Sequence, residues 1–184
     1  MGDRQMLPVQ TKRSFMVRRR YQRLDIRIAR LRLRPTRPAR PPGIEREGQH
    51  VSDRPTILFL CVHNAGRSQM ARAFAHHLSG GAVDVYSGGS EPANSVNPVA
   101  VDAMAEIGID IRSERPKRWT DAEVRSADVV ITMGCGDTCP VFPGIRYEDW
   151  KVTDPHGTGM DTVRQVRDDI EHRVRSLLDD LGIT

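Results

Sequence analysis

One cysteine of the chain stands at a spacing that suits oxyanion chemistry. Cys61 follows the apolar run "TILFL" and precedes Arg67 and Ser68 by six and seven residues, in "CVHNAGRS". A thiolate is a strong nucleophile, and an arginine guanidinium presents a planar fork to two oxygens of a tetrahedral anion. The spacing therefore predicts a cysteine nucleophile that is held beside an anion.

The residues between Cys61 and Ser68 suit a loop that leads from a strand into a helix. Such a turn leaves several backbone N–H groups facing one concavity, where the helix dipole adds positive potential and favours a thiolate. Gly66 allows a tight backbone path, Asn64 can brace the loop, and the Ser68 hydroxyl can donate a hydrogen bond to the thiolate. The residues that we expect to bind the anion are Val62, His63, Asn64, Ala65, Gly66 and Arg67.

The elements that must position this loop alternate between two patterns. Apolar, β-rich runs predict strands at residues 56–62, 82–87, 128–134 and 145–152. Helix formers with start and stop signals predict helices at residues 68–78, 97–108, 121–127 and 161–182. This alternation is typical of an α/β fold with a parallel sheet covered on both faces and a ligand site at the carboxyl ends of the strands.

The chain divides by charge into two unlike parts. Residues 1–54 hold 15 Lys and Arg against 5 Asp and Glu, whereas residues 55–184 hold 13 against 19. The first part is rich in Arg and Pro and has no sizeable apolar cluster, so it cannot bury enough surface to offset the entropy of ordering. We therefore expect residues 1–53 to be a disordered basic extension, and residues 54–184 to be one domain with its own core.

Three alternatives stay open for the basic extension. Its Arg-rich, acid-poor composition is also typical of an organellar transit peptide, and a basic arm can bind nucleic acid without sequence preference. The third alternative is that the chain begins near Val51, just before the first apolar strand. The acidic domain looks complete without the extension, which favours this third alternative.

The composition argues against export and membrane insertion. The sequence contains neither the apolar core of a secretory signal nor an apolar run long enough to cross a bilayer. Three cysteines without an export signal indicate reduced thiols rather than a disulfide framework. We therefore expect a cytoplasmic protein.

The motif "CVHNAGRSQMA" resembles the phosphate-binding loop of the low-molecular-weight tyrosine phosphatase fold, and more closely that of its arsenate reductase branch. Likeness in "YSGGSEP", "NPVAVDAM", "VVITMGCGDTCPVFPG" and "DWKVTDPHG" extends the resemblance over most of residues 55–182. It implies a three-layer sandwich around a four-stranded parallel sheet, with Cys61 as nucleophile, Arg67 as anion clamp and no bound cofactor. The chain departs from many phosphatases at Gly66, where they have a second loop cysteine, and at His63, where they have glycine.

The resemblance also implies a general acid, Asp154, which stands in an Asp-Pro pair. This acid would protonate the departing oxygen. Phosphatases of this fold commonly carry aromatic residues just after that pair, where this chain has His156 and glycines. We therefore expect a small inorganic oxyanion, arsenate, rather than phosphotyrosine, although Trp119, Tyr147 or Trp150 could still supply an aromatic wall.

Reduction of arsenate requires a second thiol. Cys135 and Cys139 follow the third predicted strand in "MGCGDTCP", and thioredoxin-coupled arsenate reductases use two resolving cysteines on such a segment, with a longer loop between them. The spacing of this pair is poor for zinc and no second pair completes a site, so we expect no metal. The short segment looks most like the mycothiol-dependent branch, the arsenate-mycothiol transferases, in which external mycothiol attacks the arsenic and a mycoredoxin completes the reduction. We favour mycothiol, with a thioredoxin relay through Cys135 and Cys139 as the alternative.

Two other functions are alternatives to arsenate reduction for arsenic detoxification. A protein tyrosine phosphatase of this fold would hydrolyse an aryl phosphate much faster than it reduces arsenate. A non-enzymatic anion sensor or a nucleic-acid-binding protein would lack the nucleophile, and Cys61 is present. The sequence therefore favours an enzyme that reduces arsenate.

Overall fold

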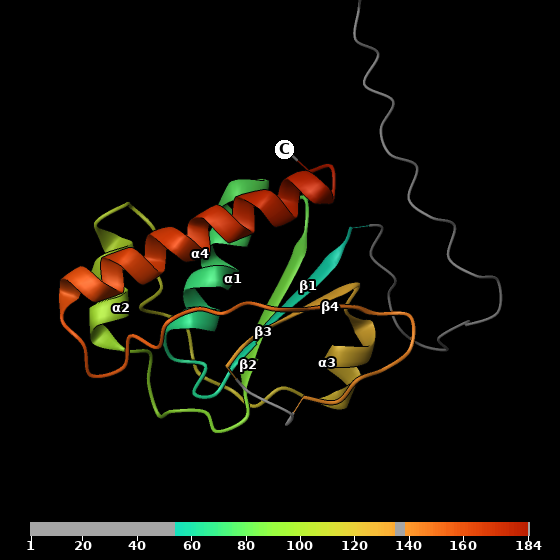
Figure 1. Ribbon diagram of the computed structural model, residues 1–184, viewed down its shortest axis with the longest axis horizontal. Coiled ribbons are helices and arrows are strands. Elements are labelled where there is room, and N and C mark those ends of the chain that lie inside the picture. The colour runs from blue at the N-terminus through green and yellow to red at the C-terminus, as the bar shows by residue number, and fades with distance from the viewer. Residues whose placement is uncertain (1–53, 135–138, 184) are drawn as a thin grey trace, which may run out of the picture. The chain divides into compact units, whose positions relative to one another are not determined.

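A four-stranded parallel sheet organises the chain in a computed structural model that describes residues 54–134 and 139–183. The strands, β1 (Thr56–Cys61), β2 (Asp84–Gly89), β3 (Val129–Met133) and β4 (Arg146–Asp149), lie in the order β2-β1-β3-β4 (Figure 1). The helices are α1 (Arg67–Ser79), α2 (Pro98–Ala105), α3 (Asp121–Ser126) and α4 (Met160–Asp180). The expected alternation of strands and helices is confirmed.

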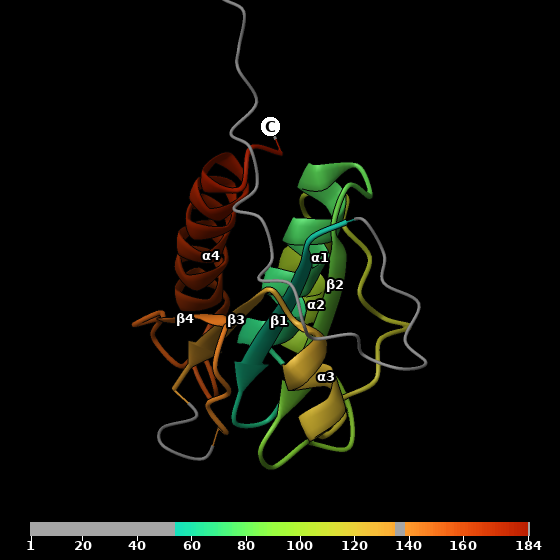
Figure 2. The ribbon, with the colours of Figure 1, turned by 90° about the vertical axis from the view of Figure 1, so that its right-hand side faces the viewer.

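Helices cover both faces of the sheet, as the sequence predicts. Side chains of β1 point alternately to the two faces: Ile57, Phe59 and Cys61 join a larger core with α1, α2 and α4, while Leu58 and Leu60 join a smaller core with α3. Figures 1 and 2 show α1, α2 and α4 on one side of the sheet and α3 on the other. The fold is therefore the expected three-layer α/β sandwich.

Local capping chemistry marks the starts of α2 and α3 and the end of α1. The Thr120 side chain accepts from the backbone N–H of Glu123, and the Glu123 carboxylate accepts from that of Thr120, which forms a capping box at the start of α3. Asn97 caps α2, with Pro98 in its first turn. Gly80 ends α1 in the left-handed conformation. These signals are in the sequence, which is why the helices were predictable.

Strand β2 lies two residues further along the chain than the prediction of 82–87. Glycines weaken a strand, so Gly88 and Gly89 are expected to follow it, yet both pair with β1. A Cβ at Gly88 would lie 2.7 Å from the Cβ of Trp119, so glycine is required by the segment that crosses it.

Strand β4 is shorter than the prediction of 145–152. It ends at Asp149, and the next residue, Trp150, is buried in the larger core. The Trp150 ring packs against Phe59 with ring centroids 5.9 Å apart. The chain then continues as a loop toward the carboxyl ends of the strands.

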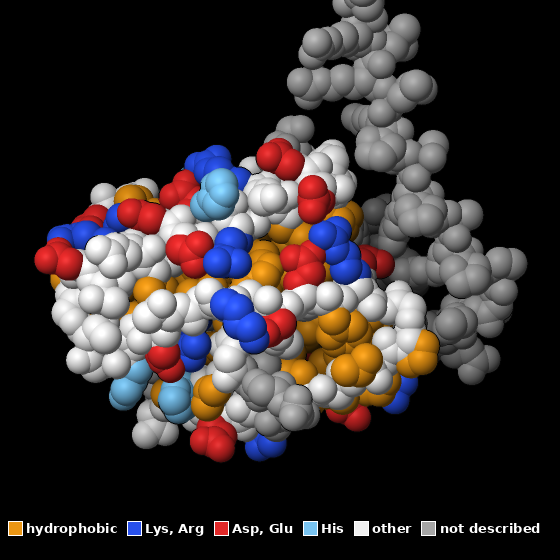
Figure 3. All heavy atoms as spheres, in the orientation of Figure 1, with side chains coloured by type: hydrophobic (Ala, Val, Ile, Leu, Met, Phe, Trp, Pro, Cys, Tyr) orange, Lys and Arg blue, Asp and Glu red, His pale blue; other side chains and the backbone are white. Residues whose placement is uncertain are grey.

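The outer face of helix α4 is charged, and its inner face is hydrogen-bonded to α2. Figure 3 shows basic and acidic side chains interspersed on this face of the molecule. The helix contains the i,i+4 ion pairs Arg173–Asp169 and Arg175–Glu171. On the inner side, the buried Arg167 donates a hydrogen bond of 2.8 Å to the carbonyl oxygen of Ala103 in α2. This contact ties α2 to α4.

Two sequence predictions lie outside the described residues, namely the basic extension of residues 1–53 and the position of Cys135. Within the described ranges, no helix is long and apolar enough to cross a membrane. The same ranges contain no group of three or more His, Cys, Asp or Glu side chains that could hold a metal ion.

Candidate active site

The sulfur of Cys61 is held by two hydrogen-bonding groups at the end of β1. Its Sγ lies 3.0 Å from the Oγ of Ser68 and accepts a hydrogen bond of 3.2 Å from the backbone N–H of Asn64. Cys61 is 3% exposed and Ser68 is fully buried. Since a thiolate carries no proton, the Ser68 hydroxyl is the donor whenever Cys61 is ionised. Both contacts therefore stabilise a negative sulfur.

The side chain of Asn64 holds the loop in place through hydrogen bonds, and its backbone adopts an uncommon conformation. Its φ of 48° is in the left-handed region, which asparagine adopts more readily than most residues. Its Nδ2 donates to Ser68 Oγ at 2.8 Å, and its Oδ1 accepts from the backbone N–H of Lys117 at 3.0 Å and from Gln69 Nε2 at 3.2 Å. The buried amide thus fixes both the loop and the hydroxyl that contacts Cys61.

The start of α1 offers backbone donors to an anion. The first turn of the helix has no side-chain cap and no acidic residue. Among the described residues, the backbone N–H groups of Ala65, Gly66, Arg67 and Ser68 have no acceptor. Such unpaired donors at a helix N-terminus form an oxyanion site.

The guanidinium of Arg67 and the carboxylate of Asp154 meet beside this loop. Arg67 Nη2 donates to Asp154 Oδ2 at 2.8 Å, and Nη1 donates to the carbonyl oxygen of Val152 at 3.4 Å. Gly134, with φ of 80°, packs under the guanidinium, and a Cβ there would lie 3.0 Å from Arg67 Nη1. Both predicted side chains therefore reach the site in a defined arrangement.

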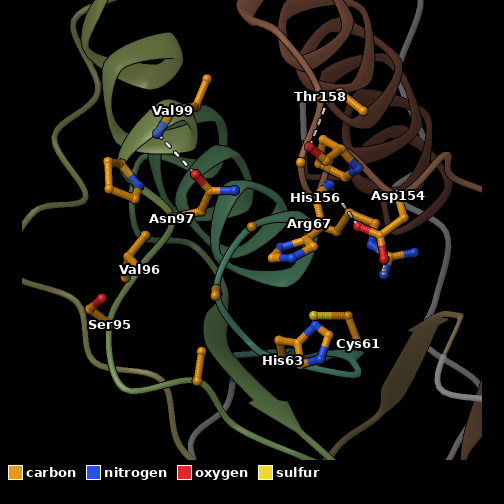
Figure 4. A pocket seen from close by; sticks show the side chains of 16 residues that line it. Cys61, His63, Arg67, Ser95, Val96, Asn97, Val99, Asp154, His156 and Thr158 are labelled. Carbon is orange, nitrogen blue, oxygen red and sulfur yellow. Dashed lines mark hydrogen bonds and ion pairs between the residues drawn. The ribbon is translucent and has the colours of Figure 1, made fainter.

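A cavity of about 420 Å³ opens above Cys61 (Figure 4). Its walls are the loop after β1, the segment 93–99 that leads into α2, and the segment 154–158 before α4. Among the described residues, no Phe, Tyr or Trp lines it. Trp119 and Tyr147 pack against the smaller core, and Trp150 is buried in the larger one, so none of them forms an aromatic wall here.

Cys139 lies on the other face of the sheet from Cys61. It packs against the smaller core, which contains Leu58 and Leu60, whereas Cys61 belongs to the larger core. Cys135 is outside the described residues. The structure therefore brings Cys61, Ser68, Arg67 and Asp154 together and leaves Cys139 apart from them.

Comparison with known proteins identifies the family. The sequence model for low molecular weight phosphotyrosine protein phosphatases matches residues 56–183. The chain belongs to this family. A putative arsenate reductase from Halobacterium salinarum is 39% identical over 129 residues, which cover 67% of this chain and 91% of that protein.

Two solved structures show the same phosphatase fold in arsenate reductases. A thioredoxin-dependent arsenate reductase from Corynebacterium glutamicum is 42% identical with a TM-score of 0.66, and the match covers 74% of this chain and 66% of that one. An arsenate reductase in a phosphate-binding state is 34% identical with a TM-score of 0.62, and the match covers 69% and 98%.

Some residues of this phosphatase-family site carry no signal in the sequence. Lys117 acts through its backbone N–H, which every residue but proline has, and it lies 53 positions from Asn64. Gln69 follows the motif directly, but its hydrogen bonds to Asn64 depend on the path of the loop. Residues 93–99, which form one wall of the cavity, lead into α2. In the sequence, this segment indicates only the start of a helix.

Proposed function

We propose that the protein is an arsenate reductase that uses Cys61 as its nucleophile. The observation that carries the proposal is the buried Cys61 sulfur at the cavity floor, with the unpaired N–H groups of the loop and the Arg67 guanidinium beside it. Relatives named as arsenate reductases, at 34% to 42% identity, support the choice of substrate. Arsenate matches phosphate in charge and shape, and therefore suits the same cradle.

The proposed first step forms a bond between sulfur and arsenic. The Cys61 thiolate attacks arsenate, while Arg67 and the loop N–H groups stabilise the charge on the remaining oxygens. Asp154 serves as the general acid, because it lies against Arg67 and reaches the cavity. The departing oxygen takes up protons and leaves as water, and arsenic stays in the pentavalent state on Cys61.

The shape of the cavity favours arsenate over phosphotyrosine. A phosphotyrosine ring requires a deep slot with aromatic walls, and no described Phe, Tyr or Trp lines the cavity. The ring side chains present there are His63 and His156. We therefore propose that hydrolysis of aryl phosphates is a minor activity.

For the reductant, we propose a low-molecular-weight thiol, mycothiol, with a mycoredoxin completing the reduction. Two observations support it. Cys139 packs on the face of the sheet opposite to Cys61, so a relay through Cys139 requires residues of this segment to move. The cavity reaches Cys61 directly and has room for a second molecule. The alternative is a thioredoxin-coupled relay through Cys135 and Cys139, which is favoured by the name of the Corynebacterium glutamicum relative.

A paired assay tests the function and the reductant. Arsenate-dependent NADPH consumption is measured once with mycothiol, mycoredoxin and its reductase, and once with thioredoxin and thioredoxin reductase. We expect turnover with the first set. Turnover with thioredoxin alone would favour the relay, whereas rapid aryl phosphate hydrolysis without arsenate reduction by either set would overturn the proposed function.

We also propose that residues 54–184 form the catalytic domain by themselves. The family match and all site residues lie within this range. Removal of residues 1–50 is expected to leave the rate of arsenate reduction within about twofold, which is less than 0.5 kcal/mol in barrier at roughly 1.4 kcal/mol per tenfold. A large fall in kcat after truncation would contradict this assignment.

A further inference from the structure

The proposed formation of the arsenic adduct uses no imidazole of the two histidines at the cavity. His63 lies in the loop after β1, and His156 follows Asp154 by two residues. Both side chains are exposed, both line the cavity with Cys61, and their ring centroids are 6.0 Å apart (Figure 4). Among the described residues, neither imidazole has a hydrogen-bond partner.

The imidazoles are the strongest bases of the cavity that are available to accept a proton. Of the other titratable side chains that line the described cavity, Cys61 is bonded to arsenic in the adduct and Arg67 stays protonated in proteins. Asp154 also lines the cavity and is a carboxylate after the first step, but a carboxylate is a weaker base than an imidazole. A neutral imidazole has one nitrogen that accepts a proton near neutral pH.

The cavity is larger than the oxyanion requires. A water molecule has a share of about 30 Å³ in the liquid, so the few heavy atoms of a tetrahedral oxyanion fill a minor part of a cavity of about 420 Å³. The rest is lined largely by small apolar side chains, among them Ala93, Val96, Pro98 and Val99. This volume suits the organic part of a small thiol, and the two imidazoles line the same space as Cys61.

We propose that His63 and His156 activate a low-molecular-weight thiol that enters this cavity, a role that rests on the proposed function. One imidazole takes the proton of the incoming thiol, and the resulting thiolate attacks arsenic. The bond between arsenic and the incoming sulfur forms as the bond to Cys61 breaks. Cys61 leaves as a thiolate, stabilised by Ser68 and the Asn64 N–H, and the imidazolium returns the proton to it.

Arsenic stays pentavalent throughout this transfer. The product is a conjugate of the small thiol with arsenate, and Cys61 is regenerated as a thiol. Reduction follows in a separate step, in which a second thiol attacks the sulfur of the conjugate. That attack forms a disulfide, and the electron pair of the broken bond converts arsenate to arsenite.

The test uses His63→Gln, His156→Gln and the double variant of the full chain. The initial rate of arsenate consumption is measured with 2-mercaptoethanol and with trifluoroethanethiol, a more acidic thiol that is mostly ionised at pH 8. His77→Gln, an exposed histidine of α1, is the matched control. The phosphate inhibition constant is measured for each variant and reports on the anion-binding loop.

Loss of a general base slows attack by a thiol that is still protonated, but it does not slow attack by a thiol that is already ionised. We expect the double variant to lose roughly a hundredfold in kcat/KM for 2-mercaptoethanol and less than about fivefold for trifluoroethanethiol. The phosphate inhibition constant is expected to stay within about threefold, since the anion is held by the loop and Arg67. His77→Gln should match the wild type in all three values.

The outcomes distinguish a failure of the proposed role of the two histidines from a failure of the proposed arsenate reductase function. Wild-type turnover with an equal loss for both thiols, or with no loss, would overturn the role of the histidines and leave the proposed function standing. A fall in phosphate affinity as large as the fall in turnover would show that the histidines act on the anion, and would also overturn it. Failure of the wild type with both thiols and with thioredoxin would overturn the function and the role together.

Discussion

Arg67 and Asp154 lie 87 residues apart in the sequence and form an ion pair of 2.8 Å between Nη2 and Oδ2. The arginine side chain is 8% exposed and the aspartate side chain 50%, so the carboxylate is the partner with room to move. An oxyanion in the loop competes with Asp154 for the same guanidinium. In the proposed mechanism, anion binding therefore releases Asp154 from Arg67, and the freed carboxyl group takes up from solvent the proton that it donates to the departing oxygen.

Asp154→Asn separates binding from proton transfer. Asparagine cannot donate the proton, and it no longer competes as a charge for Arg67. We expect kcat for arsenate reduction to fall by roughly 10²–10³-fold, because general acid catalysis contributes about that much, while phosphate inhibition does not weaken. Asp161→Asn, an exposed ion-pair partner of Arg164 in α4, is the control and should change neither value. A kcat within twofold of the wild type would remove Asp154 from the mechanism.

Arg67→Lys keeps a positive charge and removes the fork. Lysine cannot reach both Asp154 and the carbonyl oxygen of Val152 with the same geometry. We expect the phosphate inhibition constant to rise about thirtyfold, from the loss of about 2 kcal/mol in charged hydrogen bonds. Arg72→Lys, which alters the ion pair with Glu114, is the control. Equal phosphate inhibition for both variants would contradict the role of the guanidinium fork.

Gly134→Ala tests the support under the guanidinium. Gly134 and Gly108 both have φ of 80°, but only at Gly134 would a Cβ contact Arg67, at 3.0 Å from Nη1, whereas nothing lies within 4 Å of one at Gly108. We expect each alanine variant to lose about 1–2 kcal/mol of unfolding free energy from backbone strain. Only Gly134→Ala should also weaken phosphate inhibition, by several-fold. Denaturant titration and inhibition assays measure the two effects, and weaker inhibition in both variants would contradict this account of Gly134.

The proximity of Cys61, Arg67 and Ser68 was predictable because the three residues share one short loop. A strand, a turn and a helix fix the positions of Cys61, Arg67 and Ser68 by local geometry alone, and the sequence contains all three signals. The fold was predictable for the same reason, since alternating strands and helices leave few topologies open. Asp154 depended on resemblance, because an aspartate before proline is an ordinary turn residue.

The remaining features depend on contacts between distant segments. The requirement for glycine at Gly88 comes from Trp119, which crosses it, and pairing of Gly88 and Gly89 with β1 extends β2 beyond its predicted end. The brace from Lys117 to Asn64 uses a backbone group without any residue preference. The face on which Cys139 lies follows from its packing against the smaller core. None of these relationships has a pattern within its own segment.

Replacement of both Cys135 and Cys139 by serine separates the two schemes for the reductant. An external thiol needs no second protein thiol, so we expect mycothiol-dependent turnover to stay within a few-fold, or under about 1 kcal/mol in barrier. Under the thioredoxin relay, the variant would stop after one turnover, with arsenic or oxidised thiol held on Cys61. Mass spectrometry of the stopped enzyme identifies that species, and an inactive variant in the mycothiol assay would contradict the external-thiol scheme.

The most direct test of the account is the amount of arsenite formed from arsenate by the wild type and by Cys61→Ser, each with mycothiol and mycoredoxin and with thioredoxin. The wild type should produce arsenite, and the variant should be slower by at least about a thousandfold, because the serine hydroxyl is a far weaker nucleophile than a thiolate. Phosphate binding to the variant, measured by calorimetry, should stay within about threefold, since the loop N–H groups and Arg67 remain. Appreciable arsenite from Cys61→Ser, or none from the wild type with either reductant, would contradict the assignment of Cys61 as the nucleophile of an arsenate reductase.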